Sequence, residues 1–151
     1  MKKIILGGLV IGGKLDEKQS NKFLDFSREL GINDIDTGSL YGNGDSEIII
    51  SKYNKNKSNK FKIHTKIGLI KNIRKDKSFG VELAKLSPKY IEEASKEALR
   101  KFNSERIERL SLHGFCPYVP IEEQVGVLSE LIKKGFIKTY GICNFEESQL
   151  K

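Results

Sequence analysis

The chain has 151 residues, of which 38% are hydrophobic and 31% are charged. This size and composition fit one soluble domain with a hydrophobic core and exclude a chain that is disordered throughout. The net charge of +7 favours anionic partners, which include phosphorylated cofactors and nucleic acid. The densest basic run, residues 52–62, carries no aromatic side chains besides Tyr53 and Phe61. We therefore expect a solvated turn there and no nucleic-acid partner.

The cysteines and the N-terminus indicate a cytoplasmic protein. Cys116 and Cys143 form neither a disulfide framework nor a metal-binding spacing, so we expect free thiols in a reducing compartment and no metal site. The opening MKKIILGGLVIGGK resembles the start of a signal peptide. Glycines interrupt its apolar run, however, and no small-residue cleavage site follows. We expect neither export nor a membrane contact.

The first half of the chain predicts two strand–helix units and a third strand. A glycine-rich opening strand precedes a helix over residues 16–30, which Gly31 ends. Helical spacing predicts that Phe23, Phe26 and Leu30 share the core-facing side of this helix. The later elements are expected, in order, as a strand, a helix and a strand over residues 32–37, 46–53 and 61–67.

The opening glycines allow a second interpretation. Residues 8–14 match the phosphate-binding pattern G-x-x-x-x-G-K, but Leu15 stands where a serine or threonine should hold magnesium. A glycine-rich strand and turn is the preferred reading, and a nucleotide-phosphate site is the alternative.

The second half begins with a polar, weakly patterned segment, residues 69–86, which predicts a loop. Ser87 and Pro88 then form a helix start, and the helix runs to Phe102. The remaining expectations are a strand, a helix, a strand and a final helix over residues 107–113, 120–134, 139–144 and 146 onward.

Strands and helices alternate about every thirty residues, which predicts parallel strands joined by right-handed crossovers. A doubly wound sheet usually shows G-x-G-x-x-G after its first strand, and this chain does not. We therefore predict an α/β fold of the (β/α)8 TIM-barrel type. Since eight units take about 250 residues, the roughly five units here predict an incomplete barrel, its N-terminal part, as a single domain over residues 1–151. Such a sheet has two open edges, which favours self-association.

Polar residues stand where successive strands end: Asp36, Lys66, His113 and Asn144, with Tyr41 on the loop after Asp36. In parallel α/β folds, functional side chains gather at these carboxyl ends. Strand alternation predicts that Ile35, Thr65 and Leu112 face away from the barrel interior, and that Asp36, Lys66 and His113 face into it.

The grouped charges suggest proton chemistry. An ionisable pair in a barrel mouth is costly unless matched, so Asp36 and Lys66 should form a salt bridge. A lysine beside a tyrosine favours loss of the phenolic proton, which would make Tyr41 a general acid while His113 orients a carbonyl oxygen. Taken alone, a strand-end aspartate is often a turn cap and a single histidine is often a core residue. Their succession at neighbouring strand ends favours a site.

The ordered segments GINDIDTGSLYGNGDSE, IHTKIG, SLHGF and GFIKTYGICNF resemble the aldo-keto reductase family through nearly the whole chain. The resemblance implies a catalytic tetrad of Asp36, Tyr41, Lys66 and His113. It also implies a nicotinamide cofactor, NADP(H) in preference to NAD(H), contacted by Asp36, Cys143 and Asn144. Cys143 replaces the serine common in the family, and Glu47 is interpreted as structural. The resemblance covers the N-terminal units of the family, so we expect its C-terminal cofactor-binding units to be absent from this chain.

The implied function is NAD(P)H-dependent reduction of a small aldehyde or ketone to an alcohol, with Tyr41 as general acid. The alternative is a truncated, non-catalytic interaction or regulatory module. Two further expectations go beyond the family. Asp34 and His64 should form a buried pair one layer below Asp36 and Lys66. The segment 69–86 should overhang the site and favour acidic substrates, or be a surface loop; its basic residues are Lys71, Arg74, Lys75 and Lys77.

Overall fold

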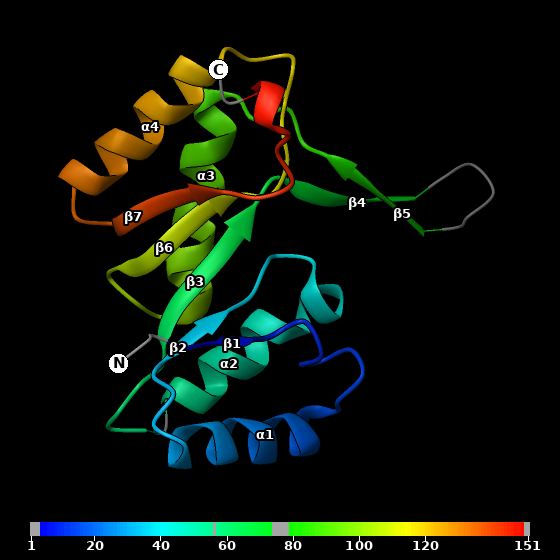
Figure 1. Ribbon diagram of the computed structural model, residues 1–151, viewed down its shortest axis with the longest axis vertical. Coiled ribbons are helices and arrows are strands. Elements are labelled where there is room, and N and C mark those ends of the chain that lie inside the picture. The colour runs from blue at the N-terminus through cyan, green and yellow to red at the C-terminus, as the bar shows by residue number, and fades with distance from the viewer. Residues whose placement is uncertain (1–3, 56, 74–78, 150–151) are drawn as a thin grey trace.

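The computed structural model describes residues 4–55, 57–73 and 79–149. Its main sheet contains five parallel strands in the order β1-β2-β3-β6-β7 (Figure 1). Each new strand is added beside the previous one, without the reversal of strand order that marks a doubly wound sheet. This arrangement is the one that a (β/α) barrel needs. The strands are β1 (Ile5–Gly7), β2 (Asp34–Asp36), β3 (Lys62–Ile67), β6 (Ile107–Leu112) and β7 (Ile137–Ile142).

Four of the five predicted helices form, and the starts of two of them follow from local sequence. Asp16 accepts a hydrogen bond from the Gln19 N–H while the Gln19 side chain accepts one from the Asp16 N–H. At the start of α3 (Pro88–Phe102) the Ser87 hydroxyl accepts a hydrogen bond from the Tyr90 N–H, and Pro88 stands in the first turn. The helices are α1 (Glu17–Glu29), α2 (Asp45–Lys55), α3 (Pro88–Phe102) and α4 (Ile121–Lys133), with short 3₁₀ turns η1 (Tyr41–Gly44) and η2 (Glu147–Gln149).

The apolar core lies between the sheet and its helices, in two clusters. One joins β3, β6 and β7 to α3 and α4 through residues such as Leu110, Leu112 and Leu128. The other joins β2 and β3 to α1 and α2 through Leu24 and Ile35. The strand residues in both clusters face the helices, so the alternate positions are free to build the opposite face of the sheet.

The predicted core face of α1 is wrong in part. Phe26 and Leu30 are 58% and 64% exposed, whereas Leu24 is fully buried together with Ser20 and Ser27. The two serines can be buried because their hydroxyls are satisfied locally: Ser20 and Ser27 donate to the carbonyl oxygens of Leu15 and Phe23. The side of α1 that packs on the fold is therefore the one with Ser20, Leu24 and Ser27, and not the one with Phe26 and Leu30.

The segment 69–86 contains an antiparallel hairpin, β4 (Leu69–Ile73) and β5 (Phe79–Leu83), so the loop prediction is wrong there. Figure 1 shows this hairpin projecting away from the main sheet. Lys71 lies exposed on β4, whereas Arg74, Lys75 and Lys77 lie outside the described residues. The preference for acidic substrates stays a prediction. The helix expected from Glu146 onward is described only as the short turn η2.

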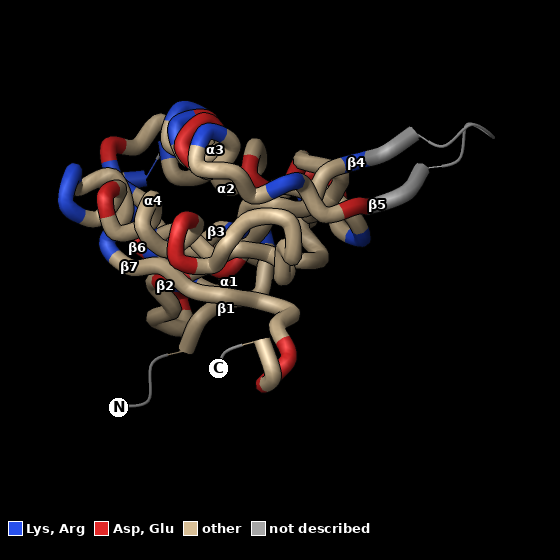
Figure 2. The backbone as a smooth tube through the Cα atoms, turned by 90° about the horizontal axis from the view of Figure 1, so that it is seen from above, with Lys and Arg blue, Asp and Glu red and all other residues tan. Residues whose placement is uncertain are grey.

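Charges are mixed over the surface of the helices. Acidic and basic residues alternate along α3 (Figure 2). They form i,i+4 ion pairs between Lys96 and Glu92 at 2.9 Å and between Lys101 and Glu97 at 3.2 Å. Among the described residues, no helix is both long enough and apolar enough to cross a membrane.

Candidate active site

The carboxyl ends of β2 and β3 bring Asp36 and Lys66 into contact. The Lys66 ammonium donates to Asp36 Oδ2 at 2.5 Å and to the main-chain oxygen of Thr37 at 2.8 Å. The lysine side chain is 9% exposed and the aspartate side chain 40%. Strand alternation is confirmed, because neighbouring Thr65 points to the helices and donates to Glu47 at 2.7 Å. The predicted salt bridge is therefore present at the rim of the sheet.

Tyr41 returns over this pair because the loop after β2 turns sharply. Gly42 has φ of 58°, and a Cβ there would lie 2.6 Å from the main-chain oxygen of Ile11. Only glycine permits both features without strain. The Lys66 ammonium lies 4.7 Å from the centre of the Tyr41 ring, within the range of a cation–π contact.

His113 follows β6 and completes the group. Its ring packs edge-on against Tyr41, with centroids 5.8 Å apart. Gly38 leaves room for both rings, since a Cβ at this position would lie 3.3 Å from His113 and 3.4 Å from Tyr41. The His113 N–H extends the strand ladder by donating to the Ile67 carbonyl at 2.8 Å. The predicted meeting of four residues at three strand ends is therefore present. We call these four residues the rim group: Asp36, Tyr41, Lys66 and His113.

Burial lowers the pKa of His113 below its ordinary value of 6.5, and the positive charge of Lys66 lowers it further, while Asp36 acts in the opposite direction. The imidazole is therefore neutral at physiological pH and offers one N–H donor and one acceptor nitrogen. Its buried Nδ1 has no hydrogen-bond partner in the described part of the chain. A neutral imidazole is suited to orient a carbonyl oxygen.

Asn144 and Cys143 lie just past β7, beside His113. The Asn144 amide donates to the His113 main-chain oxygen at 2.9 Å, and its backbone has φ of 58°. Within the described residues the side-chain carbonyl of Asn144 accepts no hydrogen bond, and the second amide hydrogen is also uncommitted. A free donor and a free acceptor on one amide fit a carboxamide such as that of nicotinamide. Cys143 is a half-buried free thiol at the same edge.

The sequence did not indicate how the candidate site is braced from behind. The Thr37 and Ser46 hydroxyls share a hydrogen bond of 2.9 Å, and Ser46 also bonds the Gly8 carbonyl at 3.2 Å. Glu47 is 2% exposed and pairs with Lys101 at 3.3 Å. These contacts attach the start of α2, and so the Tyr41 turn, to β1, β3 and α3. Of the residues in this support, Glu47 alone is indicated by the sequence, through its interpretation as structural.

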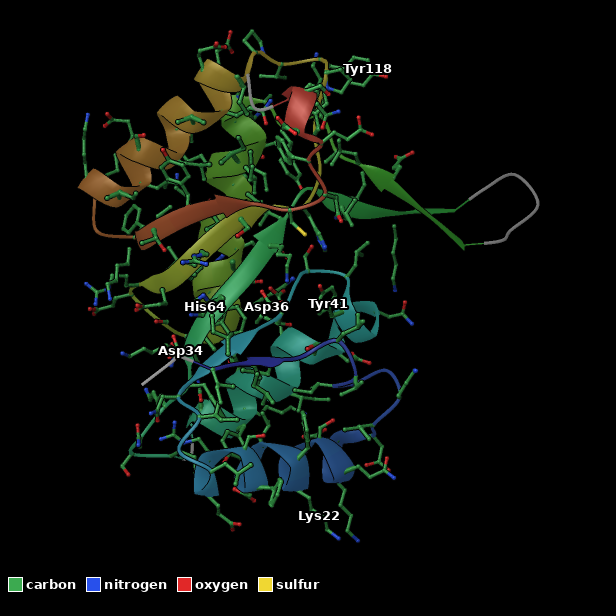
Figure 3. All side chains as sticks on the ribbon, viewed as in Figure 1. Lys22, Asp34, Asp36, Tyr41, His64 and Tyr118 are labelled. Carbon is green, nitrogen blue, oxygen red and sulfur yellow. The ribbon has the colours of Figure 1, made fainter. Side chains whose placement is uncertain are left out.

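The predicted pair of Asp34 and His64 is confirmed. His64 Nε2 lies 2.8 Å from Asp34 Oδ1, and the two residues are 5% and 4% exposed. Figure 3 shows them together toward the start of the strands, with Asp36 and Tyr41 toward the carboxyl ends. The pair lies one layer below Asp36 and Lys66, as predicted.

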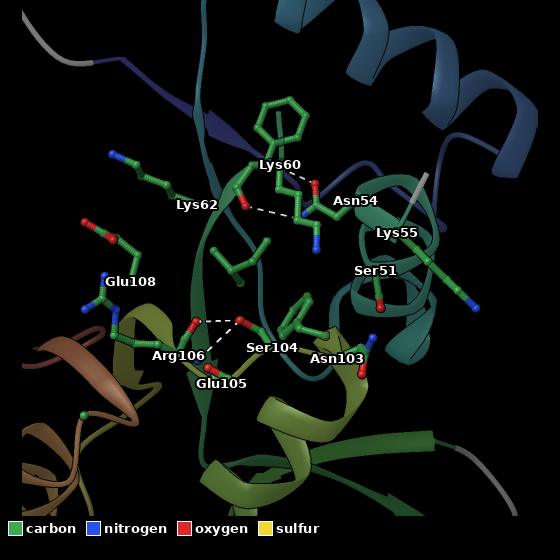
Figure 4. A pocket seen from close by; sticks show the side chains of 14 residues that line it. Ser51, Asn54, Lys55, Lys60, Lys62, Asn103, Ser104, Glu105, Arg106 and Glu108 are labelled. Carbon is green, nitrogen blue, oxygen red and sulfur yellow. Dashed lines mark hydrogen bonds between the residues drawn. The ribbon is translucent and has the colours of Figure 1, made fainter. Parts of the chain in front are cut away.

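Two other features do not extend the site. A groove of about 890 Å³ lies at the starts of β3 and β6, the opposite end of the strands (Figure 4). Its Asn54 and Ser104 side chains bond the backbone of Phe61 and Arg106, so they are structural. The main-chain N–H groups of Gly8, Ile11 and Gly13 donate to carbonyl groups, which leaves them unavailable for a phosphate. These contacts give no support to the alternative of a nucleotide-phosphate site at residues 8–14, which stays a prediction.

Among the described residues, no three histidine, cysteine, aspartate or glutamate side chains are grouped so that they could hold a metal ion. The rim group offers instead a phenol, an ammonium, a carboxylate and an imidazole around a single point.

The profile described as the Aldo/keto reductase family matches residues 3–151. The chain belongs to this family. Aldo-keto reductase dtxS3 of Metarhizium robertsii is 34% identical over 163 residues, covering 91% of this chain and 44% of that protein. Two solved structures are similar over nearly the whole chain. One is the glycerol dehydrogenase AKR11B4 from Gluconobacter oxydans, with a TM-score of 0.87 and 28% identity, where the match covers 99% of this chain and 47% of that chain. The other is the aldo-keto reductase AKR11C1 from Bacillus halodurans in its holo form, with a TM-score of 0.82 and 30% identity, where the match covers 98% of this chain and 48% of that chain.

The fold prediction is confirmed, since the five-stranded sheet and its helices correspond to part of a (β/α)8 barrel. The chain spans less than half the length of each of these relatives.

Proposed function

We propose that this chain carries the proton-transfer half of a carbonyl reductase site, in which an aldehyde or ketone is reduced to an alcohol with NADP(H), in preference to NAD(H). The observation that supports the proposal is the contact of Lys66 with Asp36, with the face of Tyr41 and with the Thr37 carbonyl. A bound nicotinamide would supply the hydride to the carbonyl carbon.

The four rim residues have distinct roles in this scheme. The carbonyl π electrons move to oxygen as the carbon is reduced, and the Tyr41 hydroxyl gives its proton to that oxygen. Lys66 stabilises the phenolate that remains, and Asp36 holds the ammonium in place. His113, neutral and 5.8 Å from Tyr41 between ring centroids, orients the carbonyl oxygen. Asn144, with Cys143, would hold the carboxamide, and Asp36 would also line the cofactor side.

The proposal is tested by cofactor binding and turnover with Tyr41→Phe. Wild-type chain should bind NADPH, measured by a change in cofactor fluorescence, and consume it with an aromatic aldehyde. Tyr41→Phe should keep cofactor affinity within about twofold but lose roughly 10²–10⁴ in kcat, the usual contribution of a general acid. Tyr118→Phe is the matched control, because Tyr118 is 78% exposed on another loop.

Retained turnover in Tyr41→Phe would contradict the assignment. Wild-type chain that neither binds NADPH nor consumes it would favour the alternative, a non-catalytic interaction module. Because Cys116 and Cys143 are free thiols, we place the activity in the cytoplasm.

We also propose self-association through β1 and β7, the edge strands of the described sheet. Tyr140 and Ile142 on β7 are 39% and 44% exposed, which leaves apolar area beside an open edge. Light scattering should show a concentration-dependent mass that Ile142→Lys reduces and Tyr118→Lys does not. A constant monomer mass at every concentration would reject it.

A further inference from the structure

A second hollow, of about 470 Å³, lies behind the Tyr41 loop on the helix side of the sheet. Its volume is in the range of small-molecule sites. The buried floor contains Ile67 and Glu47, which point away from the side of β3 that carries Lys66. The pocket is therefore distinct from the rim group, although only the thickness of β3 and one loop separates them. Its walls come from three segments: residues 39–44, residues 69–71 and one stripe of α3 from Tyr90 to Lys101.

The walls are largely apolar, with Leu40, Leu69, Ile70 and Ala94 around the opening. A ligand with an apolar body would be desolvated there without leaving polar groups unpaired.

The charges of the lining are unbalanced toward negative. Three carboxylates, Glu47, Glu93 and Glu97, face the hollow against the ammonium groups of Lys71 and Lys101. Lys101 is shared, since it lies 3.3 Å from Glu47 and 3.2 Å from Glu97. Among the described residues Glu93 pairs with Lys89 at 4.0 Å, and the two side chains are 65% and 85% exposed, respectively. Since Lys89 does not line the hollow, the lining itself carries one more carboxylate than ammonium groups, beside the apolar walls.

We propose that this pocket binds a small organic cation with an apolar body, such as a primary alkylammonium ion. The ammonium group would lie between Glu93 and Glu97, and the alkyl chain would lie against Leu40 and Ala94. The inference does not depend on the reductase proposal, because it concerns binding alone.

A ligand bound in the pocket should also affect Tyr41, because residues 39–44 both line the pocket and carry this tyrosine. Ser39 and Leu40 line the pocket and immediately precede Tyr41 in the chain, and Ser39 donates to the Leu69 carbonyl at 3.4 Å. The Tyr90 hydroxyl hydrogen-bonds the backbone of Gly68, two residues beyond Lys66. A ligand that contacts these walls would shift the loop that sets the position of the phenol.

The test is a titration of the isotope-labelled chain with hexylammonium chloride, followed by NMR. We expect saturable shifts for Leu40, Leu69 and Ala94, and shifts for Tyr41 with the same apparent Kd. Hexanoate and hexanol should bind at least about fivefold more weakly, because neither supplies a positive charge. Ala94→Phe should abolish saturable binding by filling the opening, with its fold checked by circular dichroism.

Single charge changes on α3 provide the matched comparison. Glu93→Gln and Glu97→Gln should each weaken binding about two- to fivefold, the effect of losing one partly exposed ion pair. Glu92→Gln makes the same change on the neighbouring side of the helix and should leave the Kd unchanged. Equal affinity for hexanoate, unchanged binding in Ala94→Phe, or shifts confined to Glu92, Glu123 and Glu130 between α3 and α4 would each overturn the proposal.

Discussion

Removing Asp36 should destabilise the fold more than removing Lys66, although the two side chains form one ion pair. The lysine side chain is 9% exposed and the aspartate side chain 40%. Asp36→Asn removes the negative charge and leaves an ammonium group almost without water, with only neutral acceptors: the Thr37 carbonyl at 2.8 Å and the oxygen of the new amide. Lys66→Met leaves a carboxylate that water reaches. The unpaired charge is therefore expensive in the first variant and tolerable in the second.

The magnitudes follow from the two limits for ion pairs. Removing one partner of a fully buried pair costs about 3–5 kcal/mol, and an exposed pair contributes about 0–1 kcal/mol. Since only the lysine is buried, we expect Asp36→Asn to lower the free energy of unfolding by about 2–3 kcal/mol. We expect Lys66→Met to lower it by about 1 kcal/mol or less, because methionine fills a similar volume without a charge.

Urea unfolding followed by circular dichroism at neutral pH measures both values. Glu17→Gln is the control, because Glu17 pairs with Lys52 at 3.0 Å while both side chains are more than half exposed, at 53% and 58%. This variant should lose less than about 1 kcal/mol. If Lys66→Met costs as much as Asp36→Asn, the ammonium is hydrated in solution and the reasoning fails.

Three further predictions concern the same rim. Gly42→Ala should lower the free energy of unfolding in urea by about 1–3 kcal/mol, because Gly42 has a positive φ and a Cβ there would lie 2.6 Å from the Ile11 carbonyl oxygen. The control Gly126→Ala in α4, where a Cβ meets nothing, should raise it by about 0.5–1 kcal/mol, and equal effects of the two variants would contradict this. Gly38→Ala should shift the NMR ring resonances of Tyr41 and His113 while the far-ultraviolet circular dichroism stays unchanged. Unshifted ring resonances would show that the missing side chain at Gly38 does not set the positions of the two rings. Because the folded chain holds the pKa of His113 below 6.5, the unfolded chain takes up this proton first, so the free energy of unfolding should fall as pH drops below that value; His113→Asn should weaken this slope, and an unchanged slope would refute the shift.

The position of the rim group could be predicted from sequence because it depends on two local rules. The carboxyl ends of parallel strands meet at one edge, and alternate residues of a strand face opposite sides. Together these rules separated Lys66, which contacts Asp36, from Thr65, which contacts Glu47. The same alternation predicted the pairing of Asp34 with His64.

The errors arose where distant partners decide the outcome. The β4–β5 hairpin is held by cross-strand pairing, such as Ile70 opposite Glu82, which the polar, irregular pattern of the segment did not reveal. In α1, helical spacing identified an apolar stripe that includes Phe26, but the neighbouring stripe around Leu24 is the one covered. Periodicity shows that a helix has faces, and only tertiary contacts decide which face is buried.

The glycines near the N-terminus match a phosphate-binding sequence pattern, but close backbone packing explains why they are glycines. A Cβ at Gly8 would lie 2.7 Å from the Asp36 carbonyl, and one at Gly12 would lie 2.8 Å from the Asp45 side chain. Gly42 in turn leaves no room for a side chain against Ile11. The backbone of the opening turn therefore packs directly on both ends of the loop that carries Tyr41. Glycine recurs there because two chain segments meet without side chains between them, and the support of the phenol, rather than phosphate binding, is what this close approach provides.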